Sequence, residues 1–236
     1  MVRTLCIVQA RLTSSRLPKK VLTKLGDSGL TLLEHVYARL SLAQKIDKIV
    51  FAIPDTPMND DLASFLCEKR IAYYRGSENN VLQRFFDCAK IYNPDIIVRA
   101  TCDNPCVDWN IVDELIESLG NDDYISYQKA PIGTSVEVFK IDALIKSYQS
   151  AKLPQDLEHV TPYIYKNNKD FKCKILIYNG VVYRLTVDEE SDLKLVDCIY
   201  KKIYRGFPIP NIDIYNLLEK YPDLVNLNSF VSQNSI

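Results

Sequence analysis

The sequence predicts an α/β protein in which helices cover both faces of a mostly parallel sheet, in three layers. The first observation is that short apolar segments alternate with amphipathic segments along most of the chain, as in repeated strand–helix units. The second is a dense cluster of charged and hydroxyl side chains directly after the first apolar segment, where open α/β sheets bind ligands. The length of 236 residues suits one domain, and a hydrophobic content of 47% is enough for a full core.

The expected elements follow in chain order. Apolar runs predict strands at 5–10, 48–53, 71–74, 95–100, 123–127 and 135–141. Apolar residues at helical spacing predict helices at 32–44, 59–70, 81–92, 109–119, 142–152 and 157–167, the fourth of them capped by Asp108. Residues 172–177 and 181–187 predict a hairpin around the Asn179-Gly180 turn, and a terminal helix is expected at 189–204.

Composition argues against several classes of protein. The net charge is −1, whereas a nucleic-acid-binding domain usually carries a basic excess, so we expect no nucleic-acid partner. No apolar run approaches the roughly 20 residues that cross a bilayer, and the N-terminus lacks a signal-peptide pattern. The seven cysteines are scattered and include no C-x-x-C pair, which indicates reduced thiols and a cytoplasmic protein.

The most informative segment is the loop after the first expected strand. In positions 11–20 it holds four cations and three hydroxyls, namely Arg11, Thr13, Ser14, Ser15, Arg16, Lys19 and Lys20. The loop has no glycine that would bring backbone N–H groups close to an anion, so side-chain charge would have to hold a polyphosphate. The alternative is a solvated basic loop without a ligand.

Two carboxylates follow other strands of the expected sheet. Asp103 comes after the strand at 95–100, and Asp188 comes after the strand at 181–187. If both strands run parallel to the first, the three loops meet at one sheet edge and the carboxylates face the basic loop. Mg²⁺ takes oxygen ligands from one or two carboxylates together with substrate phosphates, so we expect a Mg²⁺ site there. The alternative is that each aspartate caps the helix that follows it.

These segments resemble those of the SpsF-type cytidylyltransferases, relatives of enzymes that make CMP-activated sugar acids, such as CMP-Kdo synthetase. The family pattern Q-A-R-x-x-S-x-R-L-P-x-K runs here from Gln9 to Lys20, R-x-T-x-D-x-P spans 99–105, and V-D-x-x-x-D-L spans 187–193. The family usually has glycine in the place of Lys19, so this lysine would either add a phosphate contact or alter the turn.

The resemblance covers the chain up to about residue 204. It implies a Rossmann-like sheet of the nucleotide-diphospho-sugar transferase (GT-A-like) type, with a nucleotidyltransferase domain over 1–204. Residues 205–236 would be a C-terminal extension without the resemblance. This extension still holds an apolar stretch, 214–218, that we expect to pack on the domain or on a partner.

The resemblance also implies roles for particular residues. Those expected to bind the nucleotide are Gln9, Ala10, Arg11, Ser14, Arg16, Lys20, Arg84, Thr101 and Asp103, of which Arg11, Arg16 and Lys20 would be catalytic. Asp103 and Asp188 would hold Mg²⁺, and Glu137, Glu158 and His159 would bind the acceptor substrate. The alternatives left open are a structural role for His159 and a surface pairing of Arg84 with Glu78 or Asp87. His35 is expected to be structural.

The expected function is Mg²⁺-dependent transfer of CMP from CTP to a sugar acid, sugar phosphate or polyol phosphate for surface polysaccharide, with release of pyrophosphate. Catalysis would rest on positioning and charge, without a covalent nucleophile. One alternative is a glycosyltransferase of related architecture, although its usual D-x-D is missing at Asp103-Asn104-Pro105. Another is a non-catalytic nucleotide-binding protein, whereas a dehydrogenase is disfavoured by the missing glycine fingerprint. A homodimer is one expectation, since relatives often dimerise, and the acceptor stays open.

Overall fold

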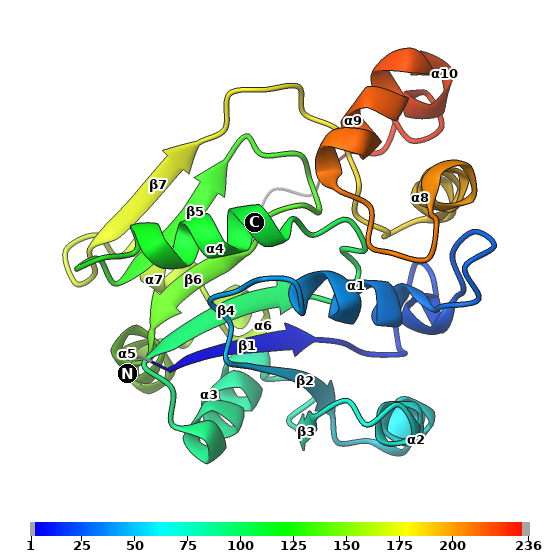
Figure 1. The fold of residues 1–236 in the computed structure, drawn as a ribbon. Coiled ribbons are helices and arrows are strands. Elements are labelled where there is room, and N and C mark those ends of the chain that lie inside the picture. The colour runs from blue at the N-terminus through cyan, green and yellow to red at the C-terminus, as the bar shows by residue number, and fades with distance from the viewer. Residues whose placement is uncertain (1–2, 233–236) are drawn as a thin grey trace.

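The computed structural model describes residues 3–232, and within this range seven strands form one sheet flanked by helices (Figure 1). The strands are β1 (Thr4–Gln9), β2 (Lys48–Pro54), β3 (Tyr73–Gly76), β4 (Ile96–Thr101), β5 (Tyr124–Gln128), β6 (Glu137–Lys140) and β7 (Cys173–Ile177). The helices are α1 (Leu32–Leu40), α2 (Asp60–Glu68), α3 (Val81–Tyr92), α4 (Trp109–Ser118), α5 (Ile141–Ser150), α6 (Pro154–His159), α7 (Pro162–Lys166), α8 (Glu190–Ile203), α9 (Asn211–Lys220) and α10 (Pro222–Val225), with short 3₁₀ turns η1 (Lys20–Leu22) and η2 (Pro57–Asn59). Of the helices in this range, none is long and apolar enough to cross a membrane.

The sheet has the strand order β3-β2-β1-β4-β6-β5-β7. β1 pairs in parallel with both β2 and β4, β2 pairs in parallel with β3, and β5 pairs in parallel with β7. Within the described chain only β6 runs against its neighbours, β4 and β5. The prediction of a mostly parallel sheet is therefore confirmed. Because β1 and β4 lie side by side and run the same way, the loops that follow them emerge at one edge of the sheet.

Helices cover both faces of the sheet, in the three layers that the sequence predicts (Figure 1). Alternate residues of β1 point to opposite sides. Cys6 and Val8 pack in a core with α1, α2, α4, α8 and α9, whereas Leu5 and Ile7 pack in a core with α3, α5 and α7. The fourth predicted helix begins where expected, because Asp108 caps α4 by accepting a hydrogen bond from a backbone N–H at 2.9 Å.

Several expected elements have different limits in the structure; the helix expected at 32–44, for example, ends at Leu40 as α1. The single helix expected at 157–167 is two short helices, α6 and α7, which are separated at Val160, whose φ is +72°. Pro162 accounts for the break, because proline has no N–H for a helix interior but suits the first turn of the next helix. The strand expected at 71–74 begins two residues later as β3, since the N–H of Ile71 still bonds back to a carbonyl of α2.

The hairpin expected between β7 and residues 181–187 is wrong. β7 adds in parallel to β5, and within the described chain 181–187 forms only an isolated bridge, between Arg184 and Ile132. The segment lies tightly on the loop before β6: Gly133 has a φ of +89°, and a Cβ there would stand 2.5 Å from the backbone nitrogen of Thr186. The end of this segment nevertheless reaches the edge of the sheet where β1 and β4 end, because the N–H of Val187 donates to the carbonyl of Asp103.

The C-terminal segment packs on the domain. Ile214 and Leu217 of α9 are buried in the same core as the apolar residues of α1 and α8. Arg39 of α1 is 1% exposed, and its guanidinium donates to the carbonyl of Ile209 and to the side chain of Asn211. A buried arginine with these partners ties the beginning of α9 to α1, so the described residues beyond 204, up to 232, belong to the same folded body.

Candidate active site

A pocket of about 710 Å³ opens at the sheet edge where β1 and β4 end. Its walls come from the loop after β1, from α3 and α6, and from the segment before α8. All the residues expected to bind nucleotide or metal line it, namely Gln9, Ala10, Arg11, Ser14, Arg16, Lys20, Arg84, Thr101, Asp103 and Asp188. Glu158 and His159 also line it. The structure therefore brings together segments that are far apart in the sequence.

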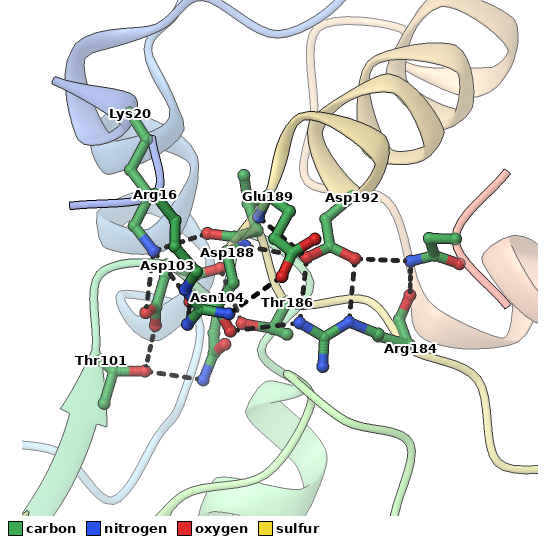
Figure 2. A network of polar contacts seen from close by, with 12 residues as sticks. Arg16, Lys20, Thr101, Asp103, Asn104, Arg184, Thr186, Asp188, Glu189 and Asp192 are labelled. Atoms are coloured by element: carbon green, nitrogen blue, oxygen red, sulfur yellow. Dashed lines mark hydrogen bonds and ion pairs between the residues drawn. The ribbon is translucent and has the colours of Figure 1, made fainter. Parts of the chain in front are cut away.

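Lys20 joins the two carboxylates expected to hold a metal (Figure 2). It stands at the beginning of η1 and is buried. Its Nζ donates to the carbonyl of Val187 at 2.7 Å and lies 3.0 Å from Asp188 Oδ1 and 3.3 Å from Asp103 Oδ2. One ammonium group thus holds the loop after β1 against both the end of β4 and the segment before α8.

Two other cations of the basic loop point in different directions. The guanidinium of Arg16 lies 3.3 Å from Asp188 and 3.4 Å from Glu189, inside the pocket. Lys19 is exposed, and its ammonium lies 3.6 Å from Asp61 on α2. The φ of Lys19 is +58°, the left-handed conformation that glycine adopts most easily. The loop therefore keeps a glycine-like turn at this position, while the lysine side chain points outside the pocket.

Neither Asp103 nor Asp188 caps a helix, so the capping alternative is wrong. Asp108 is the cap of α4, and Glu189 is the cap of α8. Asp103 accepts a hydrogen bond from the hydroxyl of Thr101 at 2.5 Å, which orients one carboxylate oxygen and leaves the other toward Lys20 (Figure 2). Both carboxylates thus face the pocket instead of a helix end.

Arg84 reaches the pocket from α3 and is only 3% exposed. Its Nη1 donates to the carbonyl of Ser77, whereas its buried Nε has no hydrogen-bond partner in the described chain. Burial, and then the nearby charge of Arg11, lowers the pKa of Arg84 to about 10. Within residues 3–232 it forms no ion pair with Glu78 or Asp87, so the surface-pairing alternative is wrong. This buried cation is available to an anion in the pocket.

Glu137, which was expected to bind the acceptor, is not among the residues that line the pocket. Its carboxylate pairs with Arg99 and accepts hydrogen bonds from the hydroxyls of Tyr124 at 2.5 Å and Thr161 at 2.7 Å. Arg99 lines the pocket instead, with its Nη2 donating to Gln9 Oε1 at 3.2 Å. Glu137 therefore orients Arg99. The sequence analysis did not assign Arg99 to the site, although its position at the start of R-x-T-x-D-x-P could have indicated it.

The part of the pocket formed by α6 carries a histidine and a carboxylate. His159 and Glu158 line it together with Gln155. Burial is the largest cause that lowers the pKa of His159 below its usual value near 6.5, so its imidazole is neutral at pH 7. His159 thus lies in a helix, as expected if it were only structural, but it also lines the pocket.

Three further residues hold the site together, and the sequence did not assign them to it. Asn59 is fully buried and accepts a hydrogen bond from the N–H of Leu12 at 2.9 Å, which fixes the loop after β1. Arg184 pairs with both Asp188 and Asp192 just before and within α8. The spacing V-D-x-x-x-D-L gave a signal for Asp192, but Arg184 was hidden in a segment expected to be a strand. Nothing in the sequence pointed to Asn59.

The oxygen ligands of the pocket fit Mg²⁺. Asp103 and Asp188 already share one cation, the ammonium of Lys20, so the space between them accepts positive charge. In the described residues no group of three or more His, Cys, Asp or Glu side chains could hold a metal. The other ligands would therefore be phosphate oxygens and water, which is how Mg²⁺ commonly binds at nucleotide sites.

The cationic pocket and its two carboxylates lie at the sheet edge where open α/β proteins bind nucleotides. The chain belongs to the cytidylyltransferase family, whose sequence model matches residues 5–236. Because the match runs through the C-terminal segment, the expectation that the resemblance ends near residue 204 is wrong.

Similar proteins agree with this family. The spore coat polysaccharide biosynthesis protein SpsF of Bacillus subtilis is 33% identical, over 93% of this chain and 95% of its own length. An uncharacterized protein of Methanocaldococcus jannaschii is 38% identical, over 97% of this chain and 96% of its own. The solved structure of a cytidylyltransferase from Leptospira borgpetersenii superposes with a TM-score of 0.88 at 26% identity, covering 99% of this chain and all of that one.

Proposed function

We propose that the protein transfers CMP from CTP to an oxygen of a sugar acid, sugar phosphate or polyol phosphate, in a Mg²⁺-dependent reaction that releases pyrophosphate. The observation that carries the proposal is the meeting of Lys20 and Arg16 with Asp103 and Asp188 in one pocket. Family membership supplies the choice of cytosine, because no contact in the pocket by itself selects a base.

The cations of the pocket bind and neutralise the triphosphate. Arg11, Arg16, Lys20 and Arg84 line it, and the buried Nε of Arg84 has no partner among the described residues. Lys20 turns its ammonium from the carboxylates toward the phosphates when the nucleotide binds, which its flexible stem permits. Bound Mg²⁺ would supply Lewis acidity at the α-phosphate and would be held by Asp103 and Asp188.

The transfer itself forms one bond and breaks one. The oxygen of the acceptor attacks the α-phosphorus, and the bond from that phosphorus to the bridging oxygen of pyrophosphate breaks in line. When the acceptor is a sugar acid and attacks through a hydroxyl, the proton of that hydroxyl passes to a ring nitrogen of His159, which is uncharged at pH 7. The phosphate oxygen of a sugar phosphate or polyol phosphate attacks as an anion and needs no base. Arg16 and Lys20 stabilise the negative charge that gathers on the leaving pyrophosphate.

The acceptor is a small anionic molecule derived from a sugar or polyol. The pocket offers Arg99 for an acidic group, and His159 and Glu158 for hydroxyl groups. The similarity to SpsF, named for spore coat polysaccharide biosynthesis, supports a product used for surface polysaccharide. We place the reaction in the cytoplasm, in keeping with seven cysteines that are all free thiols.

The test is pyrophosphate release from CTP, ATP, GTP and UTP in Mg²⁺, each with a panel of sugar acids, sugar phosphates and polyol phosphates. We expect release with CTP and one class of acceptor, no release without acceptor, and loss of release when EDTA removes the metal. A ligand that binds only the folded state raises the melting temperature more the more tightly it binds. CTP should therefore raise it more than ATP, GTP or UTP do. Transfer of a sugar from a nucleotide-sugar without pyrophosphate release would instead indicate a glycosyltransferase.

A further inference from the structure

The carboxylate of Asp188 is held by a pair of residues outside the basic loop. Its Oδ2 lies 3.2 Å from the guanidinium of Arg184, while its Oδ1 faces Lys20 at 3.0 Å and Arg16 at 3.3 Å (Figure 2). Arg184 in turn donates from Nε and Nη2 to Asp192 at 2.9 and 3.0 Å. One oxygen of Asp188 is therefore held by Arg184, and the other faces the two cations of the basic loop.

Asp192 is the anchor of this arrangement. It is fully buried, and its Oδ2 also accepts the backbone N–H groups of Asp188 at 3.0 Å and Glu189 at 3.1 Å. Asp192 thus sets both the backbone at Asp188 and the direction of Arg184.

The C-terminal segment supplies the remaining contacts. Asn228, which follows α10, is 2% exposed, and its side-chain nitrogen donates to Asp192 Oδ1 at 2.9 Å and to the carbonyl of Arg184 at 3.0 Å. Both amide hydrogens are used, and both go to the two residues that orient Asp188. Ser232, four positions later, lines the pocket itself.

We infer that Asn228 is a positioning residue, through which the C-terminal segment orients the Asp188 carboxylate toward the metal–nucleotide complex. The inference rests on the proposed function. Without the amide of Asn228, Asp192 loses one of its donors and the carbonyl of Arg184 loses its partner, so the guanidinium is free to move away from Asp188. Asn228 touches none of the reacting groups and acts only through Arg184 and Asp192.

The experiment measures the affinity of Mn²⁺ for the CTP-bound protein by water-proton relaxation, and the affinity of CTP in EDTA by calorimetry. Asn228→Ala should weaken Mn²⁺ binding about 10-fold or more, the usual effect of losing a group that orients a metal ligand. CTP affinity in EDTA should stay unchanged. Asn228→Leu, which keeps the branched shape of the side chain but has no donors, should also weaken Mn²⁺ binding. The exposed Asn226→Ala of the same segment should behave like wild type.

The same measurements in an Asp188→Asn background decide how Asn228 acts. Because Asn228 works through Asp188, Asn228→Ala should weaken Mn²⁺ binding no further there. An additional loss in that background, or a loss of CTP affinity in EDTA, would overturn the inference in favour of a general structural role. Wild-type-like Mn²⁺ binding by both Asn228 variants, while Asp188→Asn is impaired, would overturn it as well. If the wild type itself binds CTP and Mn²⁺ independently, the proposed function fails instead.

Discussion

The ammonium of Lys20 lies between the carboxylates of Asp103 and Asp188, which would otherwise repel each other. Lys20 is 7% exposed and contacts both Asp103 and Asp188. A buried charge is tolerable only when it is paired and hydrogen-bonded, and the third contact, to the carbonyl of Val187, completes its set of donors. The carboxylates are thereby already held in place for a metal. When the nucleotide binds, the metal would take the place of the Lys20 ammonium beside Asp103 and Asp188, and Lys20 would contact the phosphates instead.

The first prediction compares two cations of the same loop. Arg16→Ala should lower kcat/KM about 10²–10³-fold, because it removes a preorganised charge from the transition state. Lys19→Ala should leave kcat/KM within about twofold, because Lys19 pairs only with Asp61 at the surface. Steady-state kinetics with CTP measures both, and equal effects of the two changes would show that the loop acts only by its net charge.

The second prediction concerns His35, which lies on the buried face of α1. It is 2% exposed, its Nε2 lies 3.0 Å from the hydroxyl of Ser28, and its ring packs on Tyr200. Burial lowers its pKa to about 4, well below the usual 6.5, so the unfolded chain takes up the proton first as pH falls. Its stabilising contribution is complete above about pH 6.5 and is lost progressively down to about pH 4.

Urea unfolding between pH 7 and pH 5 tests this linkage. The wild type should lose about 2 kcal/mol from His35 over that interval. His35→Phe keeps an aromatic ring but cannot titrate, so its free energy of unfolding should depend less on pH by the same amount. Parallel pH profiles in the two proteins would mean that His35 does not change its protonation on folding in this range.

At the scale of elements, the segment 181–187 shows where sequence patterns fail. Its apolar residues and the Asn179-Gly180 turn are typical of a hairpin, yet β7 finds its partner in β5. The residues of a turn carry no information about a competing strand from elsewhere in the chain. The pairing of β7 with β5 could therefore not be predicted from the local sequence. The strand β1 was predictable, since its apolar run is buried in the sheet centre, and so were the loops that follow β1 and β4.

The third prediction tests the close approach of this segment to Gly133. A Cβ at Gly133 would meet the backbone of Leu185 and Thr186 at 2.8 and 2.5 Å. Gly120 also has a positive φ, +51°, but nothing lies within 4 Å of a Cβ there. Gly120→Ala should therefore cost only the left-handed strain of about 1 kcal/mol, and Gly133→Ala about 1–3 kcal/mol more.

The two glycine variants should also differ in activity. Gly133→Ala should reduce turnover of CTP, because it pushes the segment that carries Asp188 away from the pocket. Gly120→Ala should keep normal turnover at temperatures where it is folded. Denaturant unfolding and steady-state kinetics measure the two effects, and equal losses in both variants would contradict the role assigned to the contact.

At the scale of the whole molecule, one core unites the chain with its C-terminal segment. α9 packs with α1 and α8, and Asn228 reaches the residues that hold Asp188. The sequence predicted the sheet type, the basic loop and the place of Asp103 after β4, because these depend on local patterns and on strand edges. Asp188 reaches the same pocket although the segment before it is not a strand of the sheet. It could not predict that Asn228 and Arg184 meet, since nothing local marks a contact between an irregular segment and a distant one.

The central claim is that Asp103 and Asp188 serve one metal–nucleotide unit, and their asparagine variants test it most directly. The measurement is CTP turnover across a Mg²⁺ titration for Asp103→Asn, Asp188→Asn and the double variant, with melts without ligand and the surface change Asp61→Asn as controls. Each site variant should lose turnover at least about 10²-fold or need far more Mg²⁺, with little loss of folding stability. The double variant should be scarcely worse than either single one, because both residues act on the same unit. Normal turnover at ordinary Mg²⁺ in both single variants would contradict the account.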